Sequence, residues 1–220
     1  MIINTAFSGA GSANAGKVDG VGTIQGGVYG ELDINGVCTV EGDLKAESIS
    51  INGVCTCNGN VETTKFDCDG VMTINGNLRT GTADIDGVVT VNGNKIEADR
   101  IDCDGVLSVE GEISADVIDA DGKLNAYEIV GDRIRIKSYW KKGIVALLFK
   151  IGEKTSMKFS KIDLIEGTTI ELRGVRAKAV NGHDVTIEKN CKIDSVDASG
   201  ELRVHPSSQI GEVLNAKSPG

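Results

Sequence analysis

The sequence has little of what builds one large globular core. Only two of the 220 residues are Pro, and aromatic residues make up 4 % of the chain. Few aromatic side chains disfavour a single large core, because these side chains bury the most area each. The chain has 29 Gly residues, and a high Gly content with so little Pro is not typical of a disordered linker. No run approaches the length of about 18 apolar residues that a membrane-spanning helix needs.

Positive charge is also scarce. Lys and Arg together number 23 against 32 Asp and Glu, which gives a net charge of −9. Binding to phosphates needs a basic surface, so we expect no nucleic-acid partner. The first residues, MIINTAFSGAG, lack the positive start of a signal peptide. We therefore expect a cytoplasmic protein whose six Cys are reduced.

Residue patterns that carry catalysis are lacking as well. The two His residues, His183 and His205, lie in no recognisable motif, and there is no G-x-S-x-G sequence, P-loop or paired carboxylate motif. Cys55 and Cys57 form only a C-x-C, whereas zinc sites use four convergent ligands, usually in C-x₂₋₄-C pairs. We expect a protein that is not an enzyme and holds no cofactor or metal.

Glycine, by contrast, is abundant and periodic. There are 29 Gly residues, about twice the usual share of about 7 %. Five similar segments follow one another at an almost constant spacing: INGVCTVEGDL (34–44), INGVCTCNGNV (51–61), CDGVMTINGNL (68–78), IDGVVTVNGNK (85–95) and CDGVLSVEGEI (103–113). A weaker copy occupies 120–130, and segments 185–196 and 202–213 resume a looser version of the repeat.

Within each unit, apolar and polar residues alternate, which is the periodicity of a β-strand. Two turn signals per unit, Asn-Gly or Asp-Gly and a second Gly, separate the short strands. So short a unit cannot bury its own apolar face, and the units must therefore stack. The sequence predicts an all-β fold, a parallel β-helix solenoid with coils of about 17 residues. One predicted inward column contains Cys38, Cys55, Met72, Val89, Leu107 and Leu124.

The repeat pattern divides the chain into four parts. Residues 1–137 are the main repeat array, 138–161 an insert, 162–215 the C-terminal coils, and 216–220 a tail. The pattern leaves open whether a coil holds two or three strands. It also leaves open whether the C-terminal coils extend the main rod or fold back beside it.

The insert combines apolar and basic residues. Trp140 precedes Lys141 and Lys142, and an apolar run follows that includes Leu147, Leu148 and Phe149. Aromatic and basic residues beside an apolar run suit the surface of a membrane. The same residues suit a flap over the side or end of the helix, or a contact between subunits. These alternatives stay open.

The turn residues form a second candidate site. The turn column consists of Asn35, Asn52, Asp69, Asp86, Asp104 and Asp121. Stacked carboxylates could face calcium, but calcium takes several oxygen ligands for each ion. We interpret these residues as Asx-Gly turns on a solvated side of the coil.

Two features of the sequence point to a known family: the repeats INGVCTVEGDL and CDGVMTINGNL, and the C-terminal stretch RGVRAKAVNGHDVTIEKNCKIDSVDASGELRVHPSSQIGEV. These segments resemble the bactofilins, a family of polymer-forming cytoskeletal proteins of bacteria. The resemblance is to a longer branch of that family found in Firmicutes. The resemblance implies a right-handed β-helix that polymerises end to end without nucleotide. It also implies a scaffolding role at the membrane or envelope. The basic insert and the scarcity of Pro depart from the family pattern.

We therefore expect a cytoskeletal scaffold whose main partner is further copies of itself, because the open strand edges of a β-helix pair with other chains. It would work in the cytoplasm, with the inner membrane surface and envelope proteins as further candidate partners. The alternative is a β-helical binding or adhesion module that acts as a discrete small oligomer.

Overall fold

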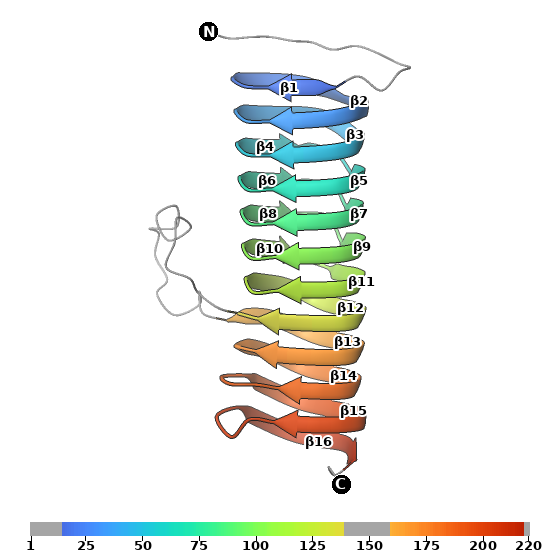
Figure 1. The fold of residues 1–220 in the computed structure, drawn as a ribbon, viewed down its shortest axis with the longest axis vertical. Helices are drawn as coiled ribbons and strands as arrows, with labels where there is room; N and C mark the ends of the chain where they lie inside the picture. Colours follow the sequence, from blue (N-terminus) through green and yellow to red (C-terminus); the bar gives the residue numbers. More distant parts are fainter. Residues whose placement is uncertain (1–14, 139–158, 218–220) are drawn as a thin grey trace.

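The computed structural model describes residues 15–138 and 159–217. These residues contain no helix; sixteen strands form one continuous sheet in which every paired neighbour is parallel. The sheet winds into a β-solenoid of about 11 turns (Figure 1). The predicted fold class, an all-β parallel solenoid with coils of about 17 residues, is confirmed.

The strands follow the order of the chain down the rod. They are β1 (Gly16–Val18), β2 (Val21–Ile34), β3 (Val37–Ile51), β4 (Val54–Cys57), β5 (Val61–Cys68), β6 (Val71–Ile74), β7 (Leu78–Ile85), β8 (Val88–Val91), β9 (Lys95–Cys103), β10 (Val106–Val109), β11 (Glu112–Ala120), β12 (Lys123–Lys137), β13 (Ser160–Arg173), β14 (Val175–Ile187), β15 (Lys192–Val204) and β16 (Gln209–Lys217).

Each coil has three sides. In the coil that begins at Val54, the short strand β4 makes the first side, and the longer β5 makes the other two. Inward and outward residues alternate along β5 except at Thr64 and Lys65, where two consecutive side chains are exposed. Two outward residues in a row reverse the phase of a strand, so β5 bends there. The sides are called faces A (54–57), B (61–63) and C (65–68), with their equivalents in other coils.

Neighbouring coils stack in register. Cys38 aligns with Cys55, and Cys55 aligns with Met72. The offset between aligned residues ranges from 15, for Ile162 and Ala177, to 18, for Leu78 and Ile96, except between β12 and β13, where the insert makes it 36. Side chains of the predicted inward columns form one continuous core, and most of them are no more than 2 % exposed. This confirms the predicted columns.

The glycine that follows each turn-column residue lies at a crowded corner of the coil. A Cβ atom on Gly53 would lie 1.9 Å from the carbonyl oxygen of Gly36 in the coil before, and one on Gly87 would lie 2.0 Å from that of Gly70. Among the described glycines, positive φ is confined to Gly27, Gly42 and Gly174. At Gly53 and Gly87, close stacking of corners therefore excludes other residues, whereas at Gly42 the positive φ does so.

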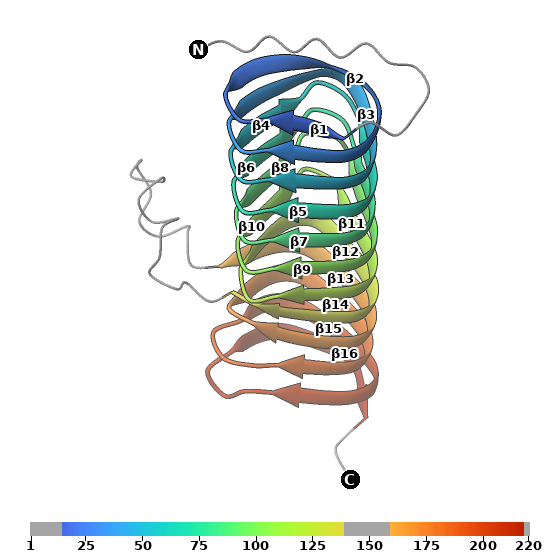
Figure 2. The same ribbon diagram turned by 45° about the horizontal axis from the view of Figure 1, so that its top comes forward.

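The C-terminal coils extend the same rod. Strand β13 pairs with β12 on one side and β14 on the other. The expected insert of 138–161 is shorter at its C-terminal end, because β13 begins at Ser160 and Lys161 aligns with Asn125. The expected tail is shorter too, since β16 runs to Lys217. Viewed from the N-terminal end, the chain turns clockwise as it recedes, so the coil is right-handed (Figure 2).

Candidate functional surfaces

The turn column lies along the corner between faces C and A. At this corner the backbone N–H groups of Asn52 and Gly53 both donate to the carbonyl oxygen of Ile34 in the preceding coil, at 2.8 and 3.0 Å. The Asn52 side chain donates to Asn35 Oδ1 at 3.0 Å. The same backbone bonds recur at Asp69 and Asp86. Backbone and amide bonds thus build the corner, and its carboxylates remain on the surface.

A second acidic column, which the sequence analysis missed, runs beside the turn column on face C. Its members are the outward residues that precede each turn residue by two: Asp67, Asp84, Asp102 and Asp119. The repeated D-x-D-G sequence was the available signal. Burial first, and then the neighbouring carboxylates, raise the pKa of both Asp84 and Asp86. Mutual repulsion is therefore built into this surface.

Basic side chains limit the two acidic columns at their C-terminal end. Arg135 aligns with Asp119 in the coil before, forms an ion pair with it, and donates to Asp121 at 3.0 Å. Nearer the N-terminal end, Arg100 lies 3.2 Å from Asp102. Within residues 15–138 and 159–217, no group of three His, Cys, Asp or Glu is placed to hold a metal ion.

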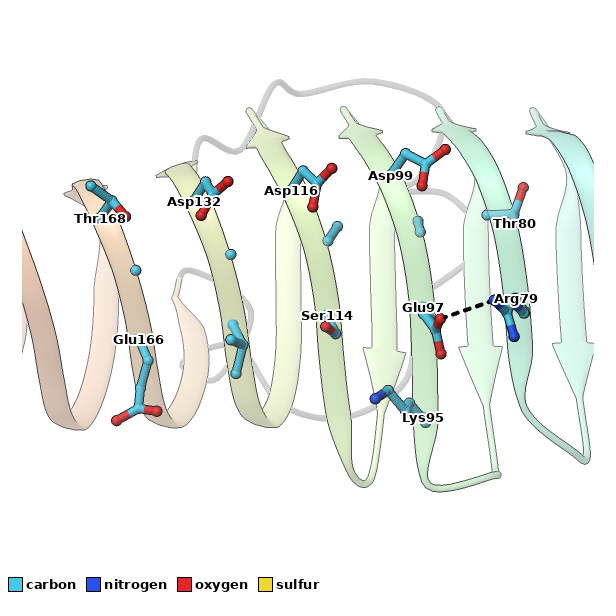
Figure 3. Close-up of a pocket in the computed structure, with 15 residues that line it drawn as sticks. Arg79, Thr80, Lys95, Glu97, Asp99, Ser114, Asp116, Asp132, Glu166 and Thr168 are labelled. Atoms are coloured by element: carbon cyan, nitrogen blue, oxygen red, sulfur yellow. Dashed lines mark ion pairs between the residues drawn. The ribbon is translucent and has the colours of Figure 1, made fainter.

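A shallow groove of about 580 Å³ crosses the corner between faces B and C (Figure 3). Asp99, Asp116 and Asp132 line one side of it, in successive coils. Ala98, Ala115, Gly131 and Gly167 also line it, and Arg79 forms an ion pair with Glu97 at 3.4 Å on face B. The small side chains open the groove, and its charged rim suits a polar ligand. Sequence reasoning did not find it.

The cysteines lie in the core, as predicted. All six are free and buried. Burial raises the pKa of Cys68 and of Cys103 to about 12. These thiols stay protonated at neutral pH and are poor nucleophiles. Cys38 and Cys55 are register partners, and their hydrogen bond lowers the pKa of Cys38.

The two histidines lie apart on the surface. His183 Nδ1 is 3.0 Å from Ser199 Oγ, and its Nε2 is 4.0 Å from Asp184. His205 contacts Ser207 at 2.9 Å, in the last described turn. The structure does not bring the two histidines together.

The predicted contact residues of the insert, Trp140, Lys141, Lys142, Leu147, Leu148 and Phe149, lie outside the described residues. The points where the insert leaves the rod are described. Ser138 Oγ and Ser160 Oγ are 2.6 Å apart, and the fully buried Ser160 Oγ also accepts from the backbone N–H of Leu124 at 2.9 Å. The Arg176 guanidinium lies 4.3 Å over the ring of Phe159. The two ends of the insert are therefore fixed side by side.

Comparisons with known proteins add little. No family model matches the chain, and no solved structure matches it. One curated relative, the uncharacterized protein YhbE of Bacillus subtilis (strain 168), is 42 % identical over 48 residues. That match covers 22 % of this chain and only a fifth of the relative's length. In the described part of the chain, no helix is long and apolar enough to cross a membrane.

Proposed function

We propose that this protein is a non-enzymatic cytoskeletal scaffold of bacteria that assembles through the ends of its β-solenoid, without nucleotide. The open ends carry the proposal. At the N-terminal end, the outer side of β2 from Val21 to Gln25 pairs with no described strand; at the C-terminal end, the outer side of β16 pairs with none. Unpaired strand edges are templates for pairing with another chain.

The two ends have similar dimensions. Gly16 pairs with Leu32 across the first coil, and Lys192 pairs with Gln209 across the last, so the two coils have nearly equal lengths. Apolar side chains are also exposed at the ends. Five of the eight exposed large apolar side chains among the described residues belong to the terminal coils: Val21, Val28, Val204, Val213 and Leu214. A contact between ends would cover them and continue the ladders of backbone hydrogen bonds.

The resemblance to bactofilins supports this proposal. It also implies a location in the cell, at the membrane or envelope. Free, buried cysteines suit a reducing compartment. We place the scaffold in the cytoplasm, at the inner face of the cell membrane, with further copies of itself and envelope proteins as partners.

The groove favours a second candidate function. A rim that contains Asp99, Asp116 and Asp132 could hold a polar ligand. In that case the chain is a binding or adhesion module that forms a discrete small oligomer.

Electron microscopy and light scattering of the purified protein test the assignment, without nucleotide and at low and moderate salt. We expect filaments. The double variant Val213→Lys and Leu214→Lys places charge on the C-terminal coil and should abolish them. Tyr127→Lys is the matched control, because Tyr127 is 61 % exposed but lies in the middle of the rod. Discrete particles at every concentration, or equal loss of filaments in the control, would contradict end-to-end assembly and favour the binding module.

A further inference from the structure

Two buried thiols lie one above the other near the N-terminal end of the rod. Cys38 of β3 and Cys55 of β4 are register partners on face A, and both side chains point into the core. All six cysteines of the chain lie in the described residues. No other two of these six are aligned in neighbouring coils. One column of the core therefore places two sulfur atoms in direct succession along the rod.

The spacing of this pair suits a disulfide bond. Aligned residues of neighbouring strands lie about 4.8 Å apart, and disulfides join Cα atoms that are about 4.4 to 6.8 Å apart. The Cβ atoms of a disulfide lie within about 4.5 Å, so a local shift of about 0.3 Å brings the pair into range. Cys55 and Cys57 do not fit, because two positions along one strand separate their Cβ atoms by about 6.6 Å.

The two thiols differ in acidity. The hydrogen bond from Cys55 lowers the pKa of Cys38, although burial opposes this effect. The same hydrogen bond, and then burial, raise the pKa of Cys55. Burial also raises the pKa of Cys68 and of Cys103 to about 12. The Cys38 sulfur is therefore the one that forms a thiolate most readily, and the thiolate is the form that oxidants attack.

Cys38 also lies where the core is least covered. It belongs to the second coil, and its register partner in the first coil is Gly22, which has no side chain to shield the sulfur. A second inward position of the first coil is Gly27, the register partner of Leu44. The end of a repeat array also opens at lower cost than its middle. An oxidant as small as hydrogen peroxide can therefore reach Cys38 before it reaches the deeper cysteines.

We propose that Cys38 and Cys55 are a peroxide-sensitive thiol pair, which oxidation converts into a disulfide within one chain. The Cys38 thiolate attacks one oxygen of hydrogen peroxide, the O–O bond breaks, and hydroxide leaves and takes up a proton. Cys38 is then a sulfenic acid. The Cys55 sulfur attacks the Cys38 sulfur, and the sulfenic hydroxyl leaves with the Cys55 proton as water. The two thiols lose two electrons, and the peroxide gains them.

The disulfide would tie the second coil to the third. It closes a loop of 17 residues, which is one coil of the solenoid. Such a bond restricts opening of the N-terminal coils, and thiol reductants reverse it. The inference does not rest on the proposed assembly through the ends, because both sulfur atoms lie inside a single chain.

Peptide mapping of the oxidised full-length protein tests the proposal. The reduced protein is treated with hydrogen peroxide, its remaining thiols are alkylated, and it is digested with trypsin. Cleavage at Lys45 separates Cys38, in peptide 18–45, from Cys55 and Cys57, in peptide 46–65. A disulfide between these two peptides should exceed every other disulfide by about tenfold, because only this pair of sulfur atoms is held in contact. Unfolded protein in urea should instead link the nearest pair in sequence, Cys55 and Cys57.

Two matched variants identify the partner of Cys38. Cys55 and Cys57 are both fully buried in β4, so replacing either by Ala leaves a cavity of similar size. Cys57→Ala should keep the link between the peptides. Cys55→Ala should remove it and leave Cys38 as a sulfenic acid, which dimedone labels. If either variant does not fold, fragmentation of the linked wild-type peptides assigns the partner.

Three results would overturn the proposal. The first is native protein in which no link forms between peptides 18–45 and 46–65 while other cysteines are oxidised. The second is a link that survives in Cys55→Ala and is lost in Cys57→Ala. The third is a link found only in dimers on a non-reducing gel, which would place the bond between two chains.

Discussion

The guanidinium of Arg135 donates to the carboxylate of Asp121 at 3.0 Å, across the corner that joins faces C and A. Arg135 occupies the column position that carries an aspartate in each of the four coils above it. Each of those four coils contributes two carboxylates to the acidic columns. Arg135 is the basic residue at which the aspartate column stops.

Arg135→Met should lower stability. The side chain is 30 % exposed and pairs with Asp119 as well as Asp121, so its loss leaves two adjacent carboxylates without compensation. For a partly exposed pair we expect a loss of about 1 kcal/mol, read from urea unfolding. Arg133→Met, on an exposed neighbouring position of the same strand, is the control and should change stability by less than about 0.5 kcal/mol. Equal effects would contradict a specific role for Arg135.

Asp84→Asn should raise the melting temperature at pH 7. Burial and the nearby carboxylates raise the pKa of Asp84, so the folded protein binds this proton more tightly than the unfolded chain does. The stabilising contribution is complete below the unfolded pKa, about 3.9, and is lost as the pH rises through the higher folded value. The gain from Asn should therefore be present at pH 7 and disappear near pH 3, as followed by circular dichroism.

The control for this effect is Asp163→Asn. Asp163 accepts from Lys178 Nζ at 2.6 Å, so its replacement should not raise the melting temperature at pH 7. A lower melting temperature for Asp84→Asn at pH 7 would contradict repulsion within the acidic columns.

Gly87→Ala should be severely destabilising. The new Cβ would lie 2.0 Å from the carbonyl oxygen of Gly70, and neither backbone can move without breaking the stack. We expect a loss of about 3 kcal/mol or more in urea unfolding. Val54→Ala, at a residue that is 45 % exposed, should cost less than about 1 kcal/mol. A mild effect of Gly87→Ala would show that the corners have more space than the structure gives them.

Ser160→Ala should loosen the coil at the insert. Its hydroxyl is fully buried, accepts from Leu124 N–H and contacts Ser138 Oγ. Its removal leaves a buried N–H without a partner, at a cost of about 1–3 kcal/mol. Ser195→Ala is the comparison, because that hydroxyl makes one bond near the surface, to the carbonyl oxygen of Lys178 at 3.3 Å. Equal losses in the two variants would argue against this role.

The period of the repeat was enough to predict the fold and the core. Cys38, Cys55 and Met72 share a column because the repeat spacing superposes them, and the same spacing places Val185 beside Leu202. The corner between faces B and C could not be predicted, because the residues that occupy it in successive coils share no chemical type. They are Glu47, Thr64, Gly81, Asp99 and Asp116. Stacking geometry forms this corner, and no turn residue marks it.

The candidate surfaces were predicted less completely. The turn column was visible in the Asx-Gly pairs, and the second acidic column was present in the sequence but was not recognised. The groove depends on the absence of side chains at Gly131 and Gly167, which lie beyond the well-matched repeats. Whether small residues such as these leave a hollow on the surface depends on how the side chains of neighbouring coils pack around them. The sequence of a single coil does not show that packing.

The regular stacking of the coils also makes the molecule a ruler. Each whole repeat that is added or deleted preserves every inward column and changes the length by one increment of about 4.8 Å. Coils differ in length by single residues without losing the columns, because the corners absorb the difference. A deletion of one residue inside a strand would instead shift the side chains that follow it in that strand to the opposite surface. Evolution can therefore set the length of this rod in discrete steps by gaining or losing whole repeats, without redesigning the interior.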